Sequence, residues 1–261
     1  MNTLKSKSKI IFLILILIAV YPLSADEKIE VLATNSWTAA YVKMATAGSA
    51  DYTVEQLAPS SMEHPPEYEL KPSDVKNVRD ADLLVYAGYE VLMKTVFDSF
   101  RKPEDKMVKI MTSYAPTVLE QSVLAIAQKL GTVSLAEENI SEYKREIAYS
   151  RQRLKDSGLF GKPVLVHFHQ QPLVQALGFE ILGVFGPQPL EVRQIAELGR
   201  TEPFLIIDNA HNPMAAPLVE ITGANLVELI NFPGFPLQNG DPAPDTLSGV
   251  VRFNAEKLLN N

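Results

Sequence analysis

The 261-residue sequence has no cysteine, a single tryptophan and only four histidines. The lack of cysteine excludes a disulfide scaffold, a thiolate zinc site, an iron–sulfur cluster and a cysteine nucleophile. Basic residues are outnumbered as well, and the formal net charge of −7 argues against a nucleic-acid binder, which needs a cationic face for phosphate contacts. The 46% of hydrophobic residues is nevertheless enough to build a folded core.

Several motifs that mark enzymes are also missing. The sequence contains no Gly-x-Gly-x-x-Gly, no phosphate-binding loop ending in Gly-Lys-Ser/Thr and no His-Glu-x-x-His. A Gly-x-Ser-x-Gly nucleophile turn is missing too. We therefore expect a binding function and no enzymatic activity.

The first 25 residues are typical of a secretory signal peptide. Three lysines precede an unbroken apolar run of eleven residues, and the segment ends in a small residue: Lys5, Lys7, Lys9, Ile10–Val20 and Ala25. The apolar run is too short to span a bilayer, which takes about 20 residues. We predict cleavage after Ala25 and a periplasmic product, whose net charge becomes −10 once the three lysines are removed.

Strand and helix patterns alternate through the rest of the chain. Strands are expected at Lys28–Ala33, Thr53–Ala58, Asp82–Ala87, Met107–Met111, Val164–Phe168, Glu180–Val184, Phe204–Ile207 and Leu226–Leu229. Helices are expected at Trp37–Ala47, Ser73–Ala81, Glu90–Phe100, Thr117–Leu130, Leu173–Leu177, Leu190–Leu198, Met214–Ile221 and Asp245–Leu259. Strands separated by helices imply parallel sheets.

A longer amphipathic helix interrupts this alternation near the middle of the chain. Ser134-Leu135-Ala136-Glu137 fits a capping box, and the helical pattern continues to Asp156. The predicted fold class is α/β, with two lobes of parallel sheet joined by one long rigid helix. The predicted boundaries are 26–131 for the first lobe, 132–159 for the linker helix and 160–261 for the second lobe.

All four histidines fall in or beside loops that follow strands, where open parallel sheets bind ligands. These are His64, His167, His169 and His211. His167 and His169 are two residues apart, so in a continuing strand both imidazoles would point to one face. Imidazole binds zinc, copper, nickel and iron, and Glu63 and Asp208 are the nearest acids.

Each of these residues also has a plain structural interpretation. A histidine in a polar loop is often only solvated, and a His-x-His pair can bond backbone carbonyls at a strand end. His211 is close to a helix start, where capping is an equally good role. Asp208, at a strand end, fits a helix cap or a turn residue.

Several stretches resemble a family of metal-binding receptors of ABC importers, the zinc and manganese cluster. Met62–Val75 is similar to the segment that carries the family's first ligand, and Ala81–Gly88 is similar to its next strand. Within Val164–Gly178, His167 stands eleven residues before Gly178, as in the segment after the family's linker helix. Val219–Ala224 and Asp245–Leu259 resemble its helix-Gly-Ala turn and closing helix.

The resemblance implies two lobes bridged by a rigid helix, with a metal between them. It carries His64 over as a first-lobe ligand and His167 as a second-lobe ligand, and Glu63-His64 is closer to the zinc-type members. It also implies zinc as the transported ligand, with manganese possible, and a membrane permease of an ABC importer as the partner of a monomeric receptor. A second first-lobe histidine is missing near Tyr114-Ala115-Pro116, so His169, His211 or Asp208 would have to replace it.

Two other functions remain open at this point. One is a zinc-dependent hydrolase with Glu63 or Asp208 as general base. The other is a receptor of the same fold that takes a metal chelate instead of a free ion.

Overall fold

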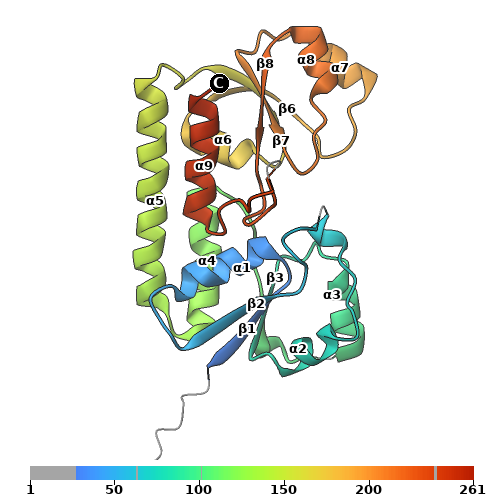
Figure 1. The fold of residues 1–261 in the computed structure, drawn as a ribbon, viewed down its shortest axis with the longest axis vertical. Helices are drawn as coiled ribbons and strands as arrows, with labels where there is room; N and C mark the ends of the chain where they lie inside the picture. The colour runs from blue at the N-terminus through green and yellow to red at the C-terminus, as the bar shows by residue number, and fades with distance from the viewer. Residues whose placement is uncertain (1–27, 63, 101, 238–239) are drawn as a thin grey trace, which may run out of the picture.

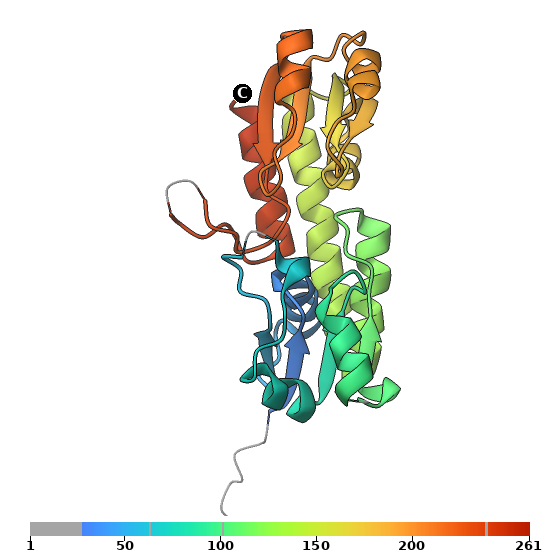
Figure 2. The ribbon, with the colours of Figure 1, turned by 90° about the vertical axis from the view of Figure 1, so that its right-hand side faces the viewer.

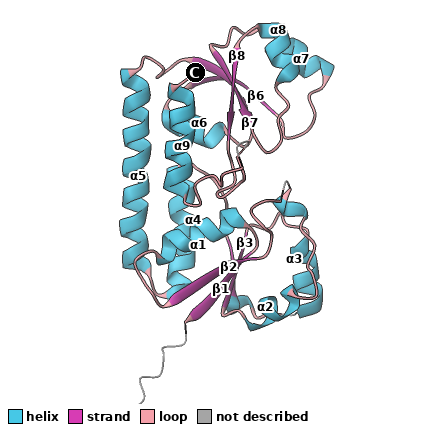
Figure 3. Cartoon of the chain, viewed as in Figure 1, coloured by secondary structure: helices cyan, strands magenta, loops and turns pink. Residues whose placement is uncertain are grey.

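The computed structural model describes residues 28–62, 64–100, 102–237 and 240–261. The predicted signal peptide, residues 1–25, lies outside this part of the chain. The described residues form two four-stranded parallel sheets in two lobes, and one long helix runs along both (Figures 1 and 3). The predicted fold class is thus confirmed. No helix within the described ranges combines the length and the apolar character needed to cross a bilayer.

The first sheet has the strand order β2-β1-β3-β4. Its strands are β1 (Ile29–Ala33), β2 (Tyr52–Gln56), β3 (Leu83–Tyr86) and β4 (Met107–Lys109). The helices of this lobe are α1 (Ser36–Thr46), α2 (Asp74–Asp80), α3 (Leu92–Thr95) and α4 (Pro116–Leu130), with short turns η1 (Pro65–Glu67), η2 (Val96–Phe100) and η3 (Glu104–Lys106).

Helices cover both faces of this sheet. Leu83 and Val85 belong to the same core cluster as residues of α1 and α4, whereas Leu84 between them belongs to a separate cluster with residues of α2 and α3. This alternation explains why β3 has an unbroken apolar sequence, as is typical of a parallel strand buried on both sides.

The second sheet has the order β6-β5-β7-β8. Its strands are β5 (Pro163–His167), β6 (Glu180–Phe185), β7 (Leu205–Asn209) and β8 (Asn225–Leu229). They alternate with α6 (Gln171–Leu177), α7 (Val192–Leu198) and α8 (Ala216–Thr222), and α9 (Leu247–Leu259) closes the chain. Figure 2 shows the two lobes stacked end to end, with the loop before α9 projecting from one side.

The linker helix α5 spans Val133–Asp156. The predicted capping box at Ser134 is wrong, because the N-cap position lies two residues earlier, at Thr132, and has no side-chain cap. The Thr132 carbonyl accepts the Ala136 N–H, so Ser134 already lies inside the first turn. Gly131 adopts the left-handed conformation that ends α4. Gly131 and Thr132 are therefore the only residues between α4 and α5.

The helix predicted over Glu90–Phe100 starts later than expected. The Glu90 carboxylate accepts the backbone N–H groups of Ala87 and Gly88, so this residue belongs to the turn after β3. The helical turns of α3 begin only at Leu92 and continue into η2.

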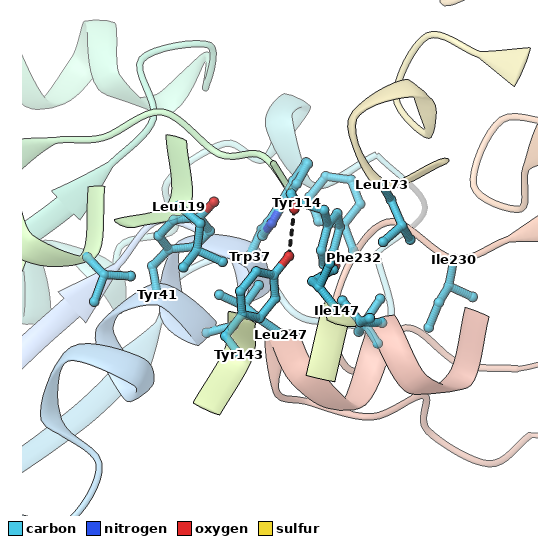
Figure 4. Packing of buried hydrophobic residues seen from close by; sticks show 14 of the residues in the cluster. Trp37, Tyr41, Tyr114, Leu119, Tyr143, Ile147, Leu173, Ile230, Phe232 and Leu247 are labelled. Carbon is cyan, nitrogen blue, oxygen red and sulfur yellow. Dashed lines mark hydrogen bonds between the residues drawn. The ribbon is translucent and has the colours of Figure 1, made fainter. Parts of the chain in front are cut away.

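One hydrophobic core crosses the boundary between the lobes. Trp37 of α1 stacks on Tyr114 and meets the edge of Phe232 from the second lobe, with ring centroids 5.5 Å apart in both pairs (Figure 4). The Tyr143 hydroxyl of α5 donates to the Tyr114 carbonyl at 2.6 Å, and the Tyr114 hydroxyl donates to the Asn231 carbonyl at 2.8 Å. The lobes are therefore joined by packed aromatic rings and hydrogen bonds as well as by α5.

Helix α9 strengthens this connection from the other end of the chain. Arg252 and Glu256 of α9 form ion pairs with Glu146 and Arg153 of α5. Just before α9, Asp245 pairs with Lys43 of the first lobe at 2.7 Å. The C-terminal helix thus packs along the linker helix, as Figure 1 shows.

Candidate metal-binding site

A cleft of about 740 Å³ lies between the lobes, where the strand ends of both sheets meet. All eight strands of the described residues contribute residues at or after their carboxyl ends, as expected for ligand sites of open parallel sheets. The lining residues are Trp37, His64, Pro66, Glu67, Ala87, Tyr89, Ile110, Met111, Thr112, Phe168, His169, Pro187, Gln188, Asn209, His211, Asn212, Asn231 and Phe232.

His64 is the first lobe's contribution to the candidate ligands. It precedes η1, in which Pro65 is buried and the Pro66 carbonyl accepts the Val91 N–H at 2.9 Å. The His64 side chain makes no capping hydrogen bond and is exposed at the cleft. The backbone on one side of His64 is therefore anchored, while its imidazole is left accessible.

His167 and His169 enter the second lobe's side of the cleft differently. The predicted strand alternation over both residues is wrong, because β5 ends at His167 and the Gln170 N–H bonds back to the His167 carbonyl at 2.8 Å, forming a turn. The two imidazoles still lie near each other, with centroids 5.2 Å apart. His169 lines the cleft, whereas His167 is fully buried and is not among the lining residues.

The turn after β6 covers His167. A Cβ on Gly186 would lie 2.6 Å from His167 Nε2, so the imidazole packs directly against the glycine backbone. Gly186 also has φ +72, a conformation that favours glycine. Access of a metal to His167 would require this turn to move.

His211 follows β7 and is 5% exposed. Its ring packs between Phe235 and Phe232, with centroid distances of 3.8 and 5.0 Å. The Asn231 N–H donates to its Nδ1 at 3.4 Å. His211 is therefore held in place on the cleft wall by the loop after β8.

Backbone hydrogen bonds determine where the protons of two imidazoles lie. His167 Nδ1 accepts the His169 N–H at 3.1 Å, just as His211 Nδ1 accepts that of Asn231. A nitrogen that accepts a hydrogen bond uses its lone pair, so each neutral ring carries its proton on Nε2. These buried Nε2–H groups have no hydrogen-bond partner within the described part of the chain. In this arrangement they are hydrogen-bond donors, whereas a metal ligand must offer a lone pair.

Burial keeps these imidazoles neutral. Desolvation lowers the pKa of His167 to about 4, with a smaller contribution from His169. Desolvation lowers the pKa of His211 to about 3, and nearby His169 and His64 add to the effect. The pKa of His169 is also lowered by burial. At neutral pH the cleft therefore has uncharged imidazoles on its second-lobe side.

Other predicted replacements do not complete a ligand set. Asp208 accepts the backbone N–H groups of Asn209, Met214 and Ala215 at 2.7–2.8 Å, which is the turn role expected from its position. Burial raises its pKa, partly opposed by these bonds. Glu63 lies outside the described residues. Across those described, no three His, Asp or Glu side chains are grouped so as to hold a metal ion.

No histidine directly follows β4, where the family resemblance implies a second first-lobe ligand. After β4 the chain presents Met111 and Thr112 to the cleft, whereas Tyr114 is buried in the core between the lobes. Trp37, Asn209, Asn212 and Asn231 also line the cleft but were not among the predicted site residues. Each lies at the end of a strand or within a few residues after it, which is the same signal that predicts the histidines.

The sequence of residues 31–122 matches the family model described as zinc-uptake complex component A, periplasmic. No curated protein matches the chain. The resemblance to metal-binding receptors that we inferred from the residues is thus supported over the first lobe.

Solved structures extend the likeness to most of the chain as a similarity of fold. FpvC of Pseudomonas aeruginosa in complex with Mn²⁺ has a TM-score of 0.69 at 16% identity, covering 90% of this chain and 98% of that one. Its Ni²⁺ complex has a TM-score of 0.68 at 17% identity, covering 90% and 96%. A periplasmic metal binding protein of Candidatus Liberibacter asiaticus has a TM-score of 0.64 at 16% identity, covering 89% and 99%.

Proposed function

We propose that the chain is a periplasmic receptor that captures a divalent metal ion between its lobes and delivers it to a membrane permease of an ABC importer. The observation that carries this proposal is that imidazoles from both lobes line one cleft: His64 from the first, His169 and His211 from the second. The family match and the shared fold support it, because the family is described as a periplasmic zinc-uptake component, FpvC was solved with Mn²⁺, and the Liberibacter protein is described as a periplasmic metal binding protein.

Within this proposal, His64 and His169 are the primary ligands. Both line the cleft, and the His64 side chain makes no capping hydrogen bond. His211 becomes a third ligand only if its ring turns away from the Asn231 N–H, and His167 only if the Gly186 turn moves. Water or donors on the cargo complete the coordination.

Zinc is the preferred cargo in this proposal and manganese the second. Imidazole ligands suit zinc, whereas manganese is better served by carboxylate and carbonyl oxygens. Glu67 is the one acidic side chain among the described residues that line the cleft. This donor set favours zinc.

The test is calorimetric titration of the chelator-stripped mature protein, from Asp26 onward, with zinc and then manganese. We expect saturable one-to-one binding of zinc, weaker binding of manganese and no zinc binding by the His64→Ala/His169→Ala double variant. Ser61→Ala is the matched control, because Ser61 is exposed in the same loop and does not line the cleft. If the wild-type protein binds neither ion, nor any complex of them, the proposed function is wrong.

A further inference from the structure

Trp37 has an N–H group that needs an acceptor. Its side chain is 6% exposed and lines the cleft, and its Nε1 has no hydrogen-bond partner among the described residues. An indole N–H can only donate, and leaving such a group unpaired in a buried position costs free energy. A metal ion cannot satisfy it, because the positive end of the N–H dipole repels a cation.

His211 presents a second donor of the same kind. Its Nδ1 accepts the Asn231 N–H, so the proton is on Nε2, which is buried and unpaired. His211 and Trp37 contact the same ring, that of Phe232, at centroid distances of 5.0 and 5.5 Å. Both side chains therefore pack against the same ring of the cleft wall.

Asn231 adds an unpaired acceptor beside these donors. Its Oδ1 is buried without a partner in the described chain, and the residue lines the cleft. A cargo that pairs the two N–H groups must carry acceptor atoms, and a water molecule held beside it can donate to Asn231 Oδ1. A bare cation offers no acceptor atom.

The size and charge of the cleft agree with a larger cargo. A volume of about 740 Å³ falls in the range of roughly 300–1,000 Å³ that small-molecule sites occupy. Aromatic and amide side chains provide much of the lining, and Glu67 is the only formally charged residue among those described there. Such a neutral wall suits a metal whose charge is already compensated by an anionic chelator.

We propose that the cleft takes its metal as a complex with a small carboxylate chelator, whose oxygens accept hydrogen bonds from Trp37 Nε1–H and His211 Nε2–H while His64 and His169 bind the metal. Charge-assisted hydrogen bonds from N–H groups to carboxylate oxygens are short and strong. The chelator also supplies the ligands that the described residues lack. This inference rests on the proposed function and names its substrate class.

The probe is the one-to-one complex of zinc with nitrilotriacetate, compared with zinc chloride and with nitrilotriacetate alone. Equilibrium dialysis against the mature protein measures how much zinc and how much chelator are retained. We expect protein, zinc and chelator in a one-to-one-to-one complex. Trp37→Phe should weaken chelator retention about tenfold, the expected order for losing a hydrogen bond to a charged group.

Tyr52→Phe is the matched control, because it also removes a single aromatic donor. The Tyr52 hydroxyl bonds the Leu130 carbonyl and is not part of the cleft lining. This variant should retain zinc and chelator like the wild type. Retention reduced equally in both variants would argue for a general effect on the fold and against the assigned Trp37 contact.

A second measurement avoids substitution altogether. Trp37 is the only tryptophan in the chain, so the ¹⁵N-labelled protein has a single indole N–H signal. The zinc complex of nitrilotriacetate should shift this proton downfield as it gains an acceptor, whereas zinc chloride should not.

The outcomes separate this inference from the proposed function. Zinc retained without chelator would overturn the proposal that the cargo is a chelate, but would leave the proposed metal capture intact. Chelator retained without zinc would overturn both, since the cargo would then be an organic anion. Retention of neither component from any of the three solutions would also overturn both.

Discussion

The two sides of the cleft are built in opposite ways. The first lobe offers His64, an exposed imidazole whose backbone is pinned at Pro66. The second lobe offers imidazoles packed into its wall, where backbone N–H groups hold His167 and His211 and burial keeps their pKa values low. One wall of the cleft is thus pre-organised by the core, while the other brings an accessible side chain to the cleft.

The largest effect should come from the accessible side. We expect His64→Ala to lower zinc affinity by at least about 100-fold, since even indirect partners of ligands cost about 10- to 100-fold. Its free energy of unfolding should stay within about 0.5 kcal/mol of wild type, because the side chain is exposed. Calorimetry and urea denaturation measure the two quantities. Wild-type affinity in this variant would remove His64 from the site.

The same substitution on the buried side should act on stability. His167→Ala leaves a cavity under the Gly186 turn and removes the acceptor of the His169 N–H. We expect a loss of about 2–4 kcal/mol in the free energy of unfolding, typical of truncating a buried, hydrogen-bonded side chain. Urea denaturation checks it, and a loss below 0.5 kcal/mol would mean that the second lobe's wall is not pre-organised.

Two glycines with nearly equal backbone conformation isolate the packing around His167. Gly186→Ala places a Cβ 2.6 Å from His167 Nε2, whereas Gly131→Ala meets nothing within 4 Å, and their φ values are +72 and +73. Both variants incur roughly 1–2 kcal/mol of left-handed strain. We expect Gly186→Ala to be less stable than Gly131→Ala by roughly a further 1–2 kcal/mol for overpacking. Equal melting temperatures would contradict the close contact.

The buried imidazoles should also make the metal-free protein sensitive to acid. The pKa values of about 4 for His167 and about 3 for His211 lie below the ordinary 6.5, so the unfolded chain binds more protons than the folded one as pH falls below 6.5. Stability is therefore full above this pH and decreases toward pH 4, by up to about 1.4 kcal/mol per pH unit for each residue. Urea titrations between pH 7 and 5 measure the slope. The His167→Asn/His211→Asn variant should have a flatter one, and an unchanged slope would count against buried neutral imidazoles.

The smallest effect is expected at the surface contact between the lobes. Lys43 and Asp245 form an ion pair, but both side chains are largely in solvent. Lys43→Met should lower stability by less than about 0.5 kcal/mol, as for exposed pairs in general, and the change should vanish in high salt. Thermal melts at low and high salt are sufficient. A larger loss would mean that this ion pair, and not mainly the aromatic core between the lobes, stabilises the contact between them.

Much of the fold was predictable because it depends on local patterns. Each sheet strand was anticipated to within a few residues, as Leu83–Tyr86 within the predicted Asp82–Ala87 shows. Errors arose where side chains bond the backbone nearby. Glu90 accepts N–H groups of the preceding turn, and His167 Nδ1 accepts the His169 N–H where the chain turns at the end of β5.

The candidate site was predictable only in part. The rule that ligands bind after parallel strands correctly placed His64, His169 and His211 on one cleft. It could not tell that His167 is covered by Gly186, nor that Trp37 would join the cleft from the start of α1. These facts depend on contacts between residues far apart in the chain, which residue spacing does not encode.

The alternation of strands and helices, the long linker helix and the number of imidazoles follow from the amino-acid sequence alone, because periodic burial and residue chemistry are local properties. Which nitrogen of each buried imidazole carries the proton, and which polar groups remain unpaired, depends on the packing of the folded chain. Those outcomes follow from single backbone N–H groups, such as that of Asn231, being brought to a particular ring atom by the packing of the whole lobe.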